Sequence, residues 1–298
     1  MKLLVIAALV SAAASTAALA QPSSNSINFD SMSLGNPPGV GGPDIRVPGD
    51  SNWYNPSNSS TQQAVTAGVG RFGTNGLVVG NNGSGNDGVI DNLRTPRLLT
   101  NAGESVGPVN STNNLFQWSL WFRTVPTSNP NGTFRFRVES YGPDRTTFLG
   151  FQQDGSGNLI ARAFGMNSSA NFVSQDITGL NWGDWYRVTG ALTFADGAAN
   201  DSISYSIFTS ANVLVGSATT PSWEEGARQL GYNGGNIFGV DALQFHSRGG
   251  SAGDHAIVDD ISYAALTIPL PPAAWAGIGS LAGVAAFGMI RRRKLAAE

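Results

Sequence analysis

Hydrophobic and polar residues alternate in short runs through most of this chain. In residues 114–123 every second residue from Phe116 to Phe122 is large and apolar, so the apolar side chains share one face of an extended segment. Similar runs occupy residues 134–139, 185–194, 203–207, 212–215 and 257–263. No sustained i, i+3, i+4 pattern occurs between residues 21 and 267. The pattern predicts an all-β domain with short helices or none.

Turn-forming residues separate these runs. Asp154–Asn158 and Asp196–Asp201 are rich in Asp, Asn and Gly and lie between extended segments, as hairpin connections do. No change of composition and no repeat of 20–50 residues divides the body. We therefore expect residues 21–267 to form one two-sheet antiparallel jelly-roll sandwich.

The order of segments in the body resembles secreted concanavalin-A-like (laminin-G-like) lectin and glucanase domains. An opening strand at 27–30 is followed by a long loop to Trp53, by central strands at 118–123 and 185–194, and by a closing strand at 257–263. The resemblance implies that the opening and closing strands pair as neighbours. Galactose-binding-like jelly rolls of carbohydrate-binding modules share these features, so the resemblance informs the fold more than the function.

The N-terminus has the three parts of a secretory signal peptide. A basic start at Met1–Lys2 precedes an apolar stretch from Leu3 to Val10, and the small-x-small sequence Ala18–Ala20 provides a cleavage site before Gln21. Residues 1–20 are therefore predicted to be removed on export.

The C-terminus has the pattern of a single membrane span. Residues 273–290 form a run of 18 residues without a charge, and four cations follow at 291–294. At 1.5 Å per residue this run is long enough for a transmembrane helix, and the cations mark its cytoplasmic end. We therefore expect the body to lie outside the membrane.

Residues 268–298 resemble the PEP-CTERM sorting signal of Gram-negative bacteria in its Pro-Leu-Pro variant. The residues that carry this resemblance are those of the proline motif and the basic cluster: Pro269, Leu270, Pro271, Pro272, Arg291, Arg292 and Arg293. The resemblance implies processing by an exosortase, a transpeptidase-like membrane enzyme, and delivery to the cell surface or to the exopolysaccharide matrix of a biofilm. Leu270 stands where the family usually has Glu, so cleavage is an open question, and a plain membrane anchor is the alternative.

Charge is low and unevenly distributed. The 298 residues include 17 Lys or Arg, 20 Asp or Glu and no Cys. Without residues 1–20 and 269–298 the chain keeps 12 Arg, no Lys and 19 Asp or Glu, and the net charge is 12 − 19 = −7. This acidic body does not favour nucleic acid as a partner, and the lack of Cys excludes disulfides and thiolate chemistry.

Catalytic motifs are mostly missing. A glycoside hydrolase needs two carboxyl groups facing one cleft, and the Glu-x-Asp-x-x-Glu strand of the glucanase relatives does not occur. Two Gly-x-Ser-x-Gly matches, at 103–107 and 249–253, have no helix after the serine. We therefore expect a non-enzymatic protein, with a secreted glycan-processing enzyme (glycoside hydrolase or lyase) as the alternative.

Calcium is the one cofactor that the sequence suggests. Asp30 in the opening strand and the pair Asp259 and Asp260 in the closing strand would lie close together if the strands pair, and Ca²⁺ prefers carboxylate and carbonyl oxygens. Neighbours on a strand point to opposite faces, and we expect Asp260 to be the one that faces inward. The alternative is that these aspartates make turn and edge hydrogen bonds.

Aromatic and polar side chains outside the core pattern are candidates for sugar binding. Sugars are recognised by a few well-placed polar groups beside aromatic rings. The candidate residues are Trp53, Trp121, Trp182, Trp223, Arg228, Tyr232 and Asp241. Together these features predict an exported surface or matrix protein that binds polysaccharide, with a purely structural matrix protein as a further alternative.

Overall fold

The computed structural model describes the greater part of the central body. The described residues are 23–34, 63–80, 91–95, 115–125, 135–141, 145–166, 171–193, 202–221, 240, 242–248 and 255–266. They form fourteen β-strands and two short 3₁₀ turns, so the predicted all-β class is confirmed. No helix in this part of the chain is long and apolar enough to cross a membrane.

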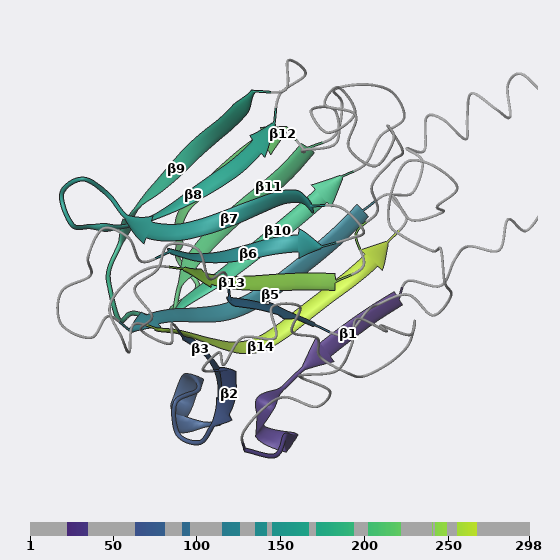
Figure 1. Cartoon of the computed structure of the whole chain (residues 1–298), viewed down its shortest axis with the longest axis vertical. Helices are drawn as coiled ribbons and strands as arrows, with labels where there is room; N and C mark the ends of the chain where they lie inside the picture. The colour runs from purple at the N-terminus through teal and green to yellow at the C-terminus, as the bar shows by residue number, and fades with distance from the viewer. Residues whose placement is uncertain are drawn as a thin grey trace, which may run out of the picture. The chain divides into compact units, whose positions relative to one another are not determined.

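The larger sheet, sheet A, has eight antiparallel strands in the order β12-β11-β10-β5-β14-β3-β2, with β1 also paired to β14 (Figure 1). Its strands are β1 (Ser23–Ile27), β2 (Gln63–Thr66), β3 (Gly76–Gly80), β5 (Leu115–Val125), β10 (Tyr186–Thr193), β11 (Ser202–Thr209), β12 (Leu214–Pro221) and β14 (His255–Leu266).

The smaller sheet, sheet B, has six antiparallel strands in the order β4-β13-β6-β7-β8-β9. Its strands are β4 (Asp91–Arg94), β6 (Arg135–Tyr141), β7 (Arg145–Gln153), β8 (Leu159–Met166), β9 (Phe172–Leu180) and β13 (Ala242–Arg248). In Figure 1 the two sheets lie one behind the other, which is the two-layer arrangement of a β-sandwich.

The core lies between the two inner faces. In β5 the burial alternates strictly, and Phe116, Trp118, Leu120 and Phe122 are all buried. The ring of Phe122 on sheet A lies 5.1 Å from that of Phe136 and 4.1 Å from that of Phe151, both on sheet B. Because aromatic rings bury a large area, this contact joins the two layers near their centre.

The opening strand differs from its predicted bounds. β1 ends at Ile27, and Phe29–Ser31 form a 3₁₀ turn that Asn28 caps by accepting a hydrogen bond from the Asp30 backbone N–H at 2.8 Å. The predicted strand at 27–30 was therefore wrong beyond its first residue, because the asparagine side chain satisfies a turn instead of a strand. β1 pairs antiparallel with β14, so the expected pairing of opening and closing strands is confirmed.

The predicted signal peptide and sorting signal both lie outside the described residues. The chain divides into two units between Thr267 and Ile268. The second unit, residues 268–298, lies entirely outside the described residues. Signal cleavage, the span at 273–290 and the role of Pro269–Pro272 stay predictions.

Candidate functional site

The outer face of sheet A carries a regular array of small polar side chains. Because residues alternate along a strand, β5 turns Gln117 and Ser119 outward between its buried core residues. The strand register then aligns these residues with their neighbours across the sheet. The result is two cross-strand rows, which we call the hydroxyl rows.

Both hydroxyl rows cross six strands, from β1 through β14, β5, β10 and β11 to β12. The first row is Ser26, Ser262, Ser119, Thr189, Ser206 and Ser217. The second row is Ser24, Ala264, Gln117, Ala191, Ser204 and Thr219.

Some of the hydroxyls in these rows bond to one another. The Ser119 and Ser262 hydroxyls are 2.9 Å apart, and those of Ser204 and Thr219 are 3.0 Å apart. A hydroxyl donates one hydrogen bond and accepts two, so each of these groups keeps capacity for a ligand.

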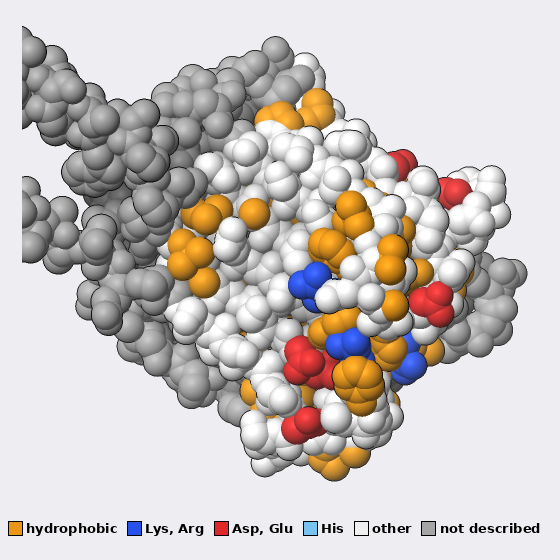
Figure 2. All heavy atoms as spheres, turned by 180° about the vertical axis from the view of Figure 1, so that it is seen from behind, with side chains coloured by type: hydrophobic (Ala, Val, Ile, Leu, Met, Phe, Trp, Pro, Cys, Tyr) orange, Lys and Arg blue, Asp and Glu red, His pale blue; other side chains and the backbone are white. Residues whose placement is uncertain are grey.

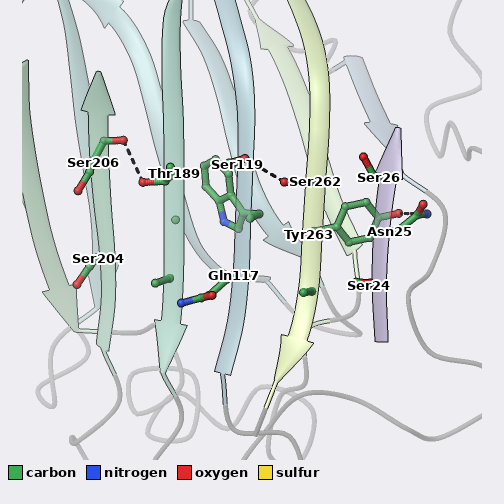
Figure 3. A pocket seen from close by; sticks show the side chains of 14 residues that line it. Ser24, Asn25, Ser26, Gln117, Ser119, Thr189, Ser204, Ser206, Ser262 and Tyr263 are labelled. Carbon is green, nitrogen blue, oxygen red and sulfur yellow. Dashed lines mark hydrogen bonds between the residues drawn. The ribbon is translucent and has the colours of Figure 1, made fainter. Parts of the chain in front are cut away.

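The hydroxyl rows, apart from Ser217 and Thr219 on β12, line an open depression of about 640 Å³ (Figure 3). The described residues that line it include no Asp, Glu, His, Lys or Arg. Beneath it the indole of Trp118 lies against the backbone of Gly190, where a Cβ atom would overlap the ring. Glycine at this position therefore lets a large core side chain support the floor of the depression.

Arginines and aromatic rings lie beside the depression on the same face, and we call this group the arginine shelf. It consists of Arg71, Phe72, Trp121, Arg123, Trp185, Arg187 and Phe208. Figure 2 shows this side of the molecule, with a wide area free of charge next to a cluster of charged and apolar side chains.

The strand register explains how the shelf is built. Trp121 is directly opposite Arg187, which is in turn opposite Phe208, one step along from the first hydroxyl row. The guanidinium carbon of Arg187 lies 4.4 Å from the centre of the Phe208 ring. Arg123 lies over Trp185 in the same way, at 5.2 Å. In each of these contacts the guanidinium group is attracted to the electron-rich face of the ring, which is a cation–π interaction.

Arg71 reaches the shelf from the turn at Arg71–Gly73. Its guanidinium carbon lies 3.4 Å from the centre of the Trp121 ring and 4.3 Å from that of Phe72. Phe72 is 84% exposed and has φ of +68°, a left-handed conformation that bulky residues rarely adopt. Such backbone strain occurs preferentially at ligand sites.

Asp259 fixes this turn to sheet A. Its carboxylate accepts hydrogen bonds from the Arg71 backbone N–H at 2.8 Å, from the Thr74 hydroxyl at 3.4 Å and from the Asp260 N–H at 2.9 Å. The residue is only 3% exposed, and burial raises the pKa of its carboxyl group. The carboxylate is thus committed to holding the strained turn in place.

Arg123 and Arg187 have no polar partner in the described part of the chain. Their Nε atoms are buried without a hydrogen bond, and the structure gives neither guanidinium an ion pair. Their side-chain neighbours on the shelf are aromatic, which stabilises the charge but uses few of the five N–H donors of each group.

The structure describes two of the predicted sugar-binding residues. Trp121 lies on the outer face of sheet A with Arg123, as its position opposite Trp118 predicted, but Arg71 covers its ring. Trp182 packs partly buried against the core and donates from Nε1 to the Gly157 carbonyl at 3.1 Å. The others lie outside the described residues: Trp53, Trp223, Arg228, Tyr232 and Asp241.

Two of the three predicted calcium ligands make hydrogen bonds to the protein. Asp30 accepts a hydrogen bond from the Asn75 N–H at 2.8 Å, and Asp259 holds the turn at Arg71. The expectation that Asp260 is the inward residue was wrong: Asp260 lies at a bulge in β14 and is exposed, whereas the turn at Arg71–Gly73 buries Asp259. No group of three metal-ligating side chains occurs among the described residues, and calcium binding stays a prediction.

Sequence reasoning missed most of the shelf. Arg71 and Phe72 belong to a Gly-rich segment whose sequence indicates only a turn. Arg187 and Phe208 belong to the site because the strand register pairs them with each other. The detectable signal was the alternation along each strand, which puts Arg187 between the buried Tyr186 and Val188 and puts Phe208 directly after the buried Ile207.

No family model matches this chain, and no curated protein matches it. Solved structures that are similar include peanut lectin with a 9mer peptide, at 13% identity, with 83% of this chain and 99% of that chain covered and a TM-score of 0.42. Alginate lyase A1-II′ of polysaccharide lyase family 7 has 13% identity, coverage of 67% and 83%, and a TM-score of 0.42.

A third similar structure is the CBM2 module of the evolved Dit of Lactobacillus casei BL23 phage J-1. It has 10% identity, coverage of 84% and 99%, and a TM-score of 0.40. Likenesses of this size carry no argument about what this chain does. The two-sheet antiparallel sandwich rests on the strand pairing of the chain itself.

Proposed function

We propose that this protein binds polysaccharide on the outer face of sheet A. The observation that carries the proposal is the depression of about 640 Å³, whose lining includes hydroxyl and amide side chains from five neighbouring strands. Neighbouring strands are about 4.8 Å apart, so the hydroxyl rows form a regular array of donors and acceptors. A sugar chain offers the complementary array of hydroxyls.

Binding is favoured over catalysis by the chemistry of the lining. The described residues around the depression include no Asp, Glu, His, Lys or Arg, and glycan hydrolysis needs a pair of carboxyl groups there. The buried carboxylate nearest to the shelf, Asp259, accepts three hydrogen bonds from the protein. We therefore propose a non-enzymatic role.

The site can be tested by blocking the depression with a bulky side chain. Ser204 is exposed on β11 and lines the depression, and Ser174 is equally exposed on β9 of sheet B. In the full chain in mild detergent, Ser204→Tyr should weaken retention on a polysaccharide array by about tenfold or more, which is ~1.4 kcal/mol. Ser174→Tyr is the matched control and should bind like the parent. Equal binding by both variants, or no retention of any polysaccharide by the parent, would refute the proposal.

We also propose that the protein is exported and anchored before processing at the cell surface or in the matrix. The sequence features at 1–20 and 268–298 support this, with an exosortase-like enzyme as the processing partner. Deleting residues 269–298 should move the protein out of the membrane fraction. Retention in that fraction after the deletion would contradict the anchor.

A further inference from the structure

The arginine shelf presents cations instead of bare rings at its surface. Arg71 covers Trp121, Arg187 lies over Phe208, and Arg123 lies over Trp185. A neutral sugar that stacks on aromatic rings would find three of these faces occupied by guanidinium groups. The surface chemistry of the shelf therefore differs from that of the hydroxyl rows beside it.

Arg123 and Arg187 are close to each other, and no acidic side chain in the described part of the chain pairs with either of them. Arg187 is directly opposite Trp121, and Arg123 is two residues along β5 from Trp121 on the same face. Such diagonal neighbours on an antiparallel pair are roughly 7–8 Å apart. The residues aligned with them across the sheet, Ile257 beside Arg123 and Phe208 beside Arg187, are apolar. Like charges at this distance repel unless an anion lies between them.

Asp259 carries a carboxyl group on this face, and it lies on the far side of Trp121 from Arg187. Asp259 pairs with Trp121 from β14, whereas Arg187 pairs with Trp121 from β10. Asp259 is also buried under the turn at Arg71–Gly73, which its oxygens hold. The cationic end of the shelf is therefore the pair Arg123 and Arg187.

We propose that the polysaccharide is acidic and that its carboxylate groups bind Arg123 and Arg187 while its hydroxyls contact the hydroxyl rows. This inference rests on the proposed function, because it names the class of chain that the same face binds. The planar N–H fork of arginine fits a carboxylate through two parallel hydrogen bonds. A ligand carboxylate would supply the partner that the described part of the chain does not give these two residues.

The test compares acidic polysaccharides with the same chains after their carboxyl groups are reduced to alcohols. Alginate and polygalacturonate, each with its carboxyl-reduced form, are titrated into the full chain in mild detergent. We expect the acidic forms to bind at least tenfold more tightly, and their affinity to fall when ionic strength rises tenfold. Arg123→Gln and Arg187→Gln should each weaken binding of the acidic forms by about tenfold and leave the reduced forms nearly unchanged.

Two further variants separate charge recognition from folding. Arg162→Gln removes an arginine from sheet B and should not change binding, and Arg187→Lys should keep part of the affinity because it keeps the charge without the fork. Melting temperatures of all variants are measured alongside. Equal affinity for acidic and reduced chains, unaffected by Arg123→Gln or Arg187→Gln, would overturn this inference and leave the proposed function intact. Absence of binding to every chain, reduced forms included, would overturn both.

Discussion

On sheet B, the outward-facing Arg162 donates to Asp176 on the neighbouring strand through Nε at 2.6 Å and Nη2 at 2.7 Å. On sheet A, Arg187 faces outward in the same way but lies over Phe208, with no carboxylate partner in the described residues. Arg162 uses the protein's own acid to join two strands. An arginine that is held by a ring and left without an acid keeps its N–H groups for a ligand, and this contrast distinguishes Arg187 from Arg162.

The two faces also differ in what lies under them. Beneath the hydroxyl rows, Trp118 packs against Gly190 with its ring 6.1 Å from that of Tyr205. On sheet B, the outward-facing Gly150 has ordinary contact distances around it, the nearest at 3.7 Å. Packing therefore requires glycine at position 190, whereas position 150 can accommodate a Cβ atom.

The largest expected effect is on this pair of glycines. Gly190→Ala places a methyl group inside the Trp118 indole, and the strain should lower the free energy of unfolding by about 1–3 kcal/mol. Gly150→Ala should change it by less than about 0.5 kcal/mol. Denaturant unfolding of the full chain measures both values. Equal costs at the two positions would show that the floor of the depression is not specially packed.

The next effect concerns the exposed strained residue of the shelf. Phe72→Gly removes a left-handed penalty of about 1–2 kcal/mol, which is partly offset by the greater freedom of glycine in the unfolded chain. The variant should therefore be as stable as the parent or up to about 1 kcal/mol more stable, while it binds polysaccharide more weakly.

Asn212→Gly is the matched control for this substitution. Asn212 has φ of +67° in the turn between β11 and β12, and asparagine tolerates that conformation well. Its replacement should leave binding unchanged. Full binding by Phe72→Gly would remove Phe72 from the site.

The smallest effect is a difference in acid behaviour between the two faces. Hydrogen bonds from Arg162 lower the pKa of Asp176 below its usual 3.8, whereas burial raises the pKa of Asp259 above 3.8. The stabilisation from Asp176 is fully present when the pH is above the pKa of this group in the unfolded chain. It is lost as the pH falls through the lower pKa of the folded state. Asp259 acts with the opposite sign, since the folded state binds its proton more tightly and gains stability as pH falls through the raised value.

Carboxyl NMR titration of the full chain measures these two aspartates directly. The pKa of Asp176 should lie below 3.8 and the pKa of Asp259 should lie above 3.8. Asp176→Asn should cost under about 1 kcal/mol at neutral pH, because the pair is about one-third exposed and solvent screens it, and nothing below the folded pKa. The reverse order of the two pKa values would contradict the burial assigned to Asp259.

The sequence predicted the fold better than the site. Alternation in residues 114–123 predicted the core face of β5, and it placed Trp121 on the opposite face. Strict alternation along residues 257–263 did not predict the bulge in β14, where one extra residue reverses the faces of the residues that follow it. The expected burial of Asp260 in place of Asp259 followed from that omission.

The shelf could not be predicted because it depends on contacts between distant segments. Arg71 and Trp121 are far apart in the chain, and only the pairing of strands and the hold of Asp259 on the turn bring them together. The hydroxyl rows likewise require the register of six strands, which no single segment encodes. Composition did indicate the polar, uncharged character of these strands.

The central claim is that the outer face of sheet A meets the polysaccharide. Hydroxyl-radical footprinting of the full chain with and without alginate tests it on two exposed rings, Phe72 at 84% exposed on the shelf and Phe172 at 63% exposed on sheet B. The account predicts that alginate protects Phe72 from oxidation and leaves Phe172 unchanged. Protection of Phe172 with no change at Phe72 would place the ligand on the other face and contradict the account.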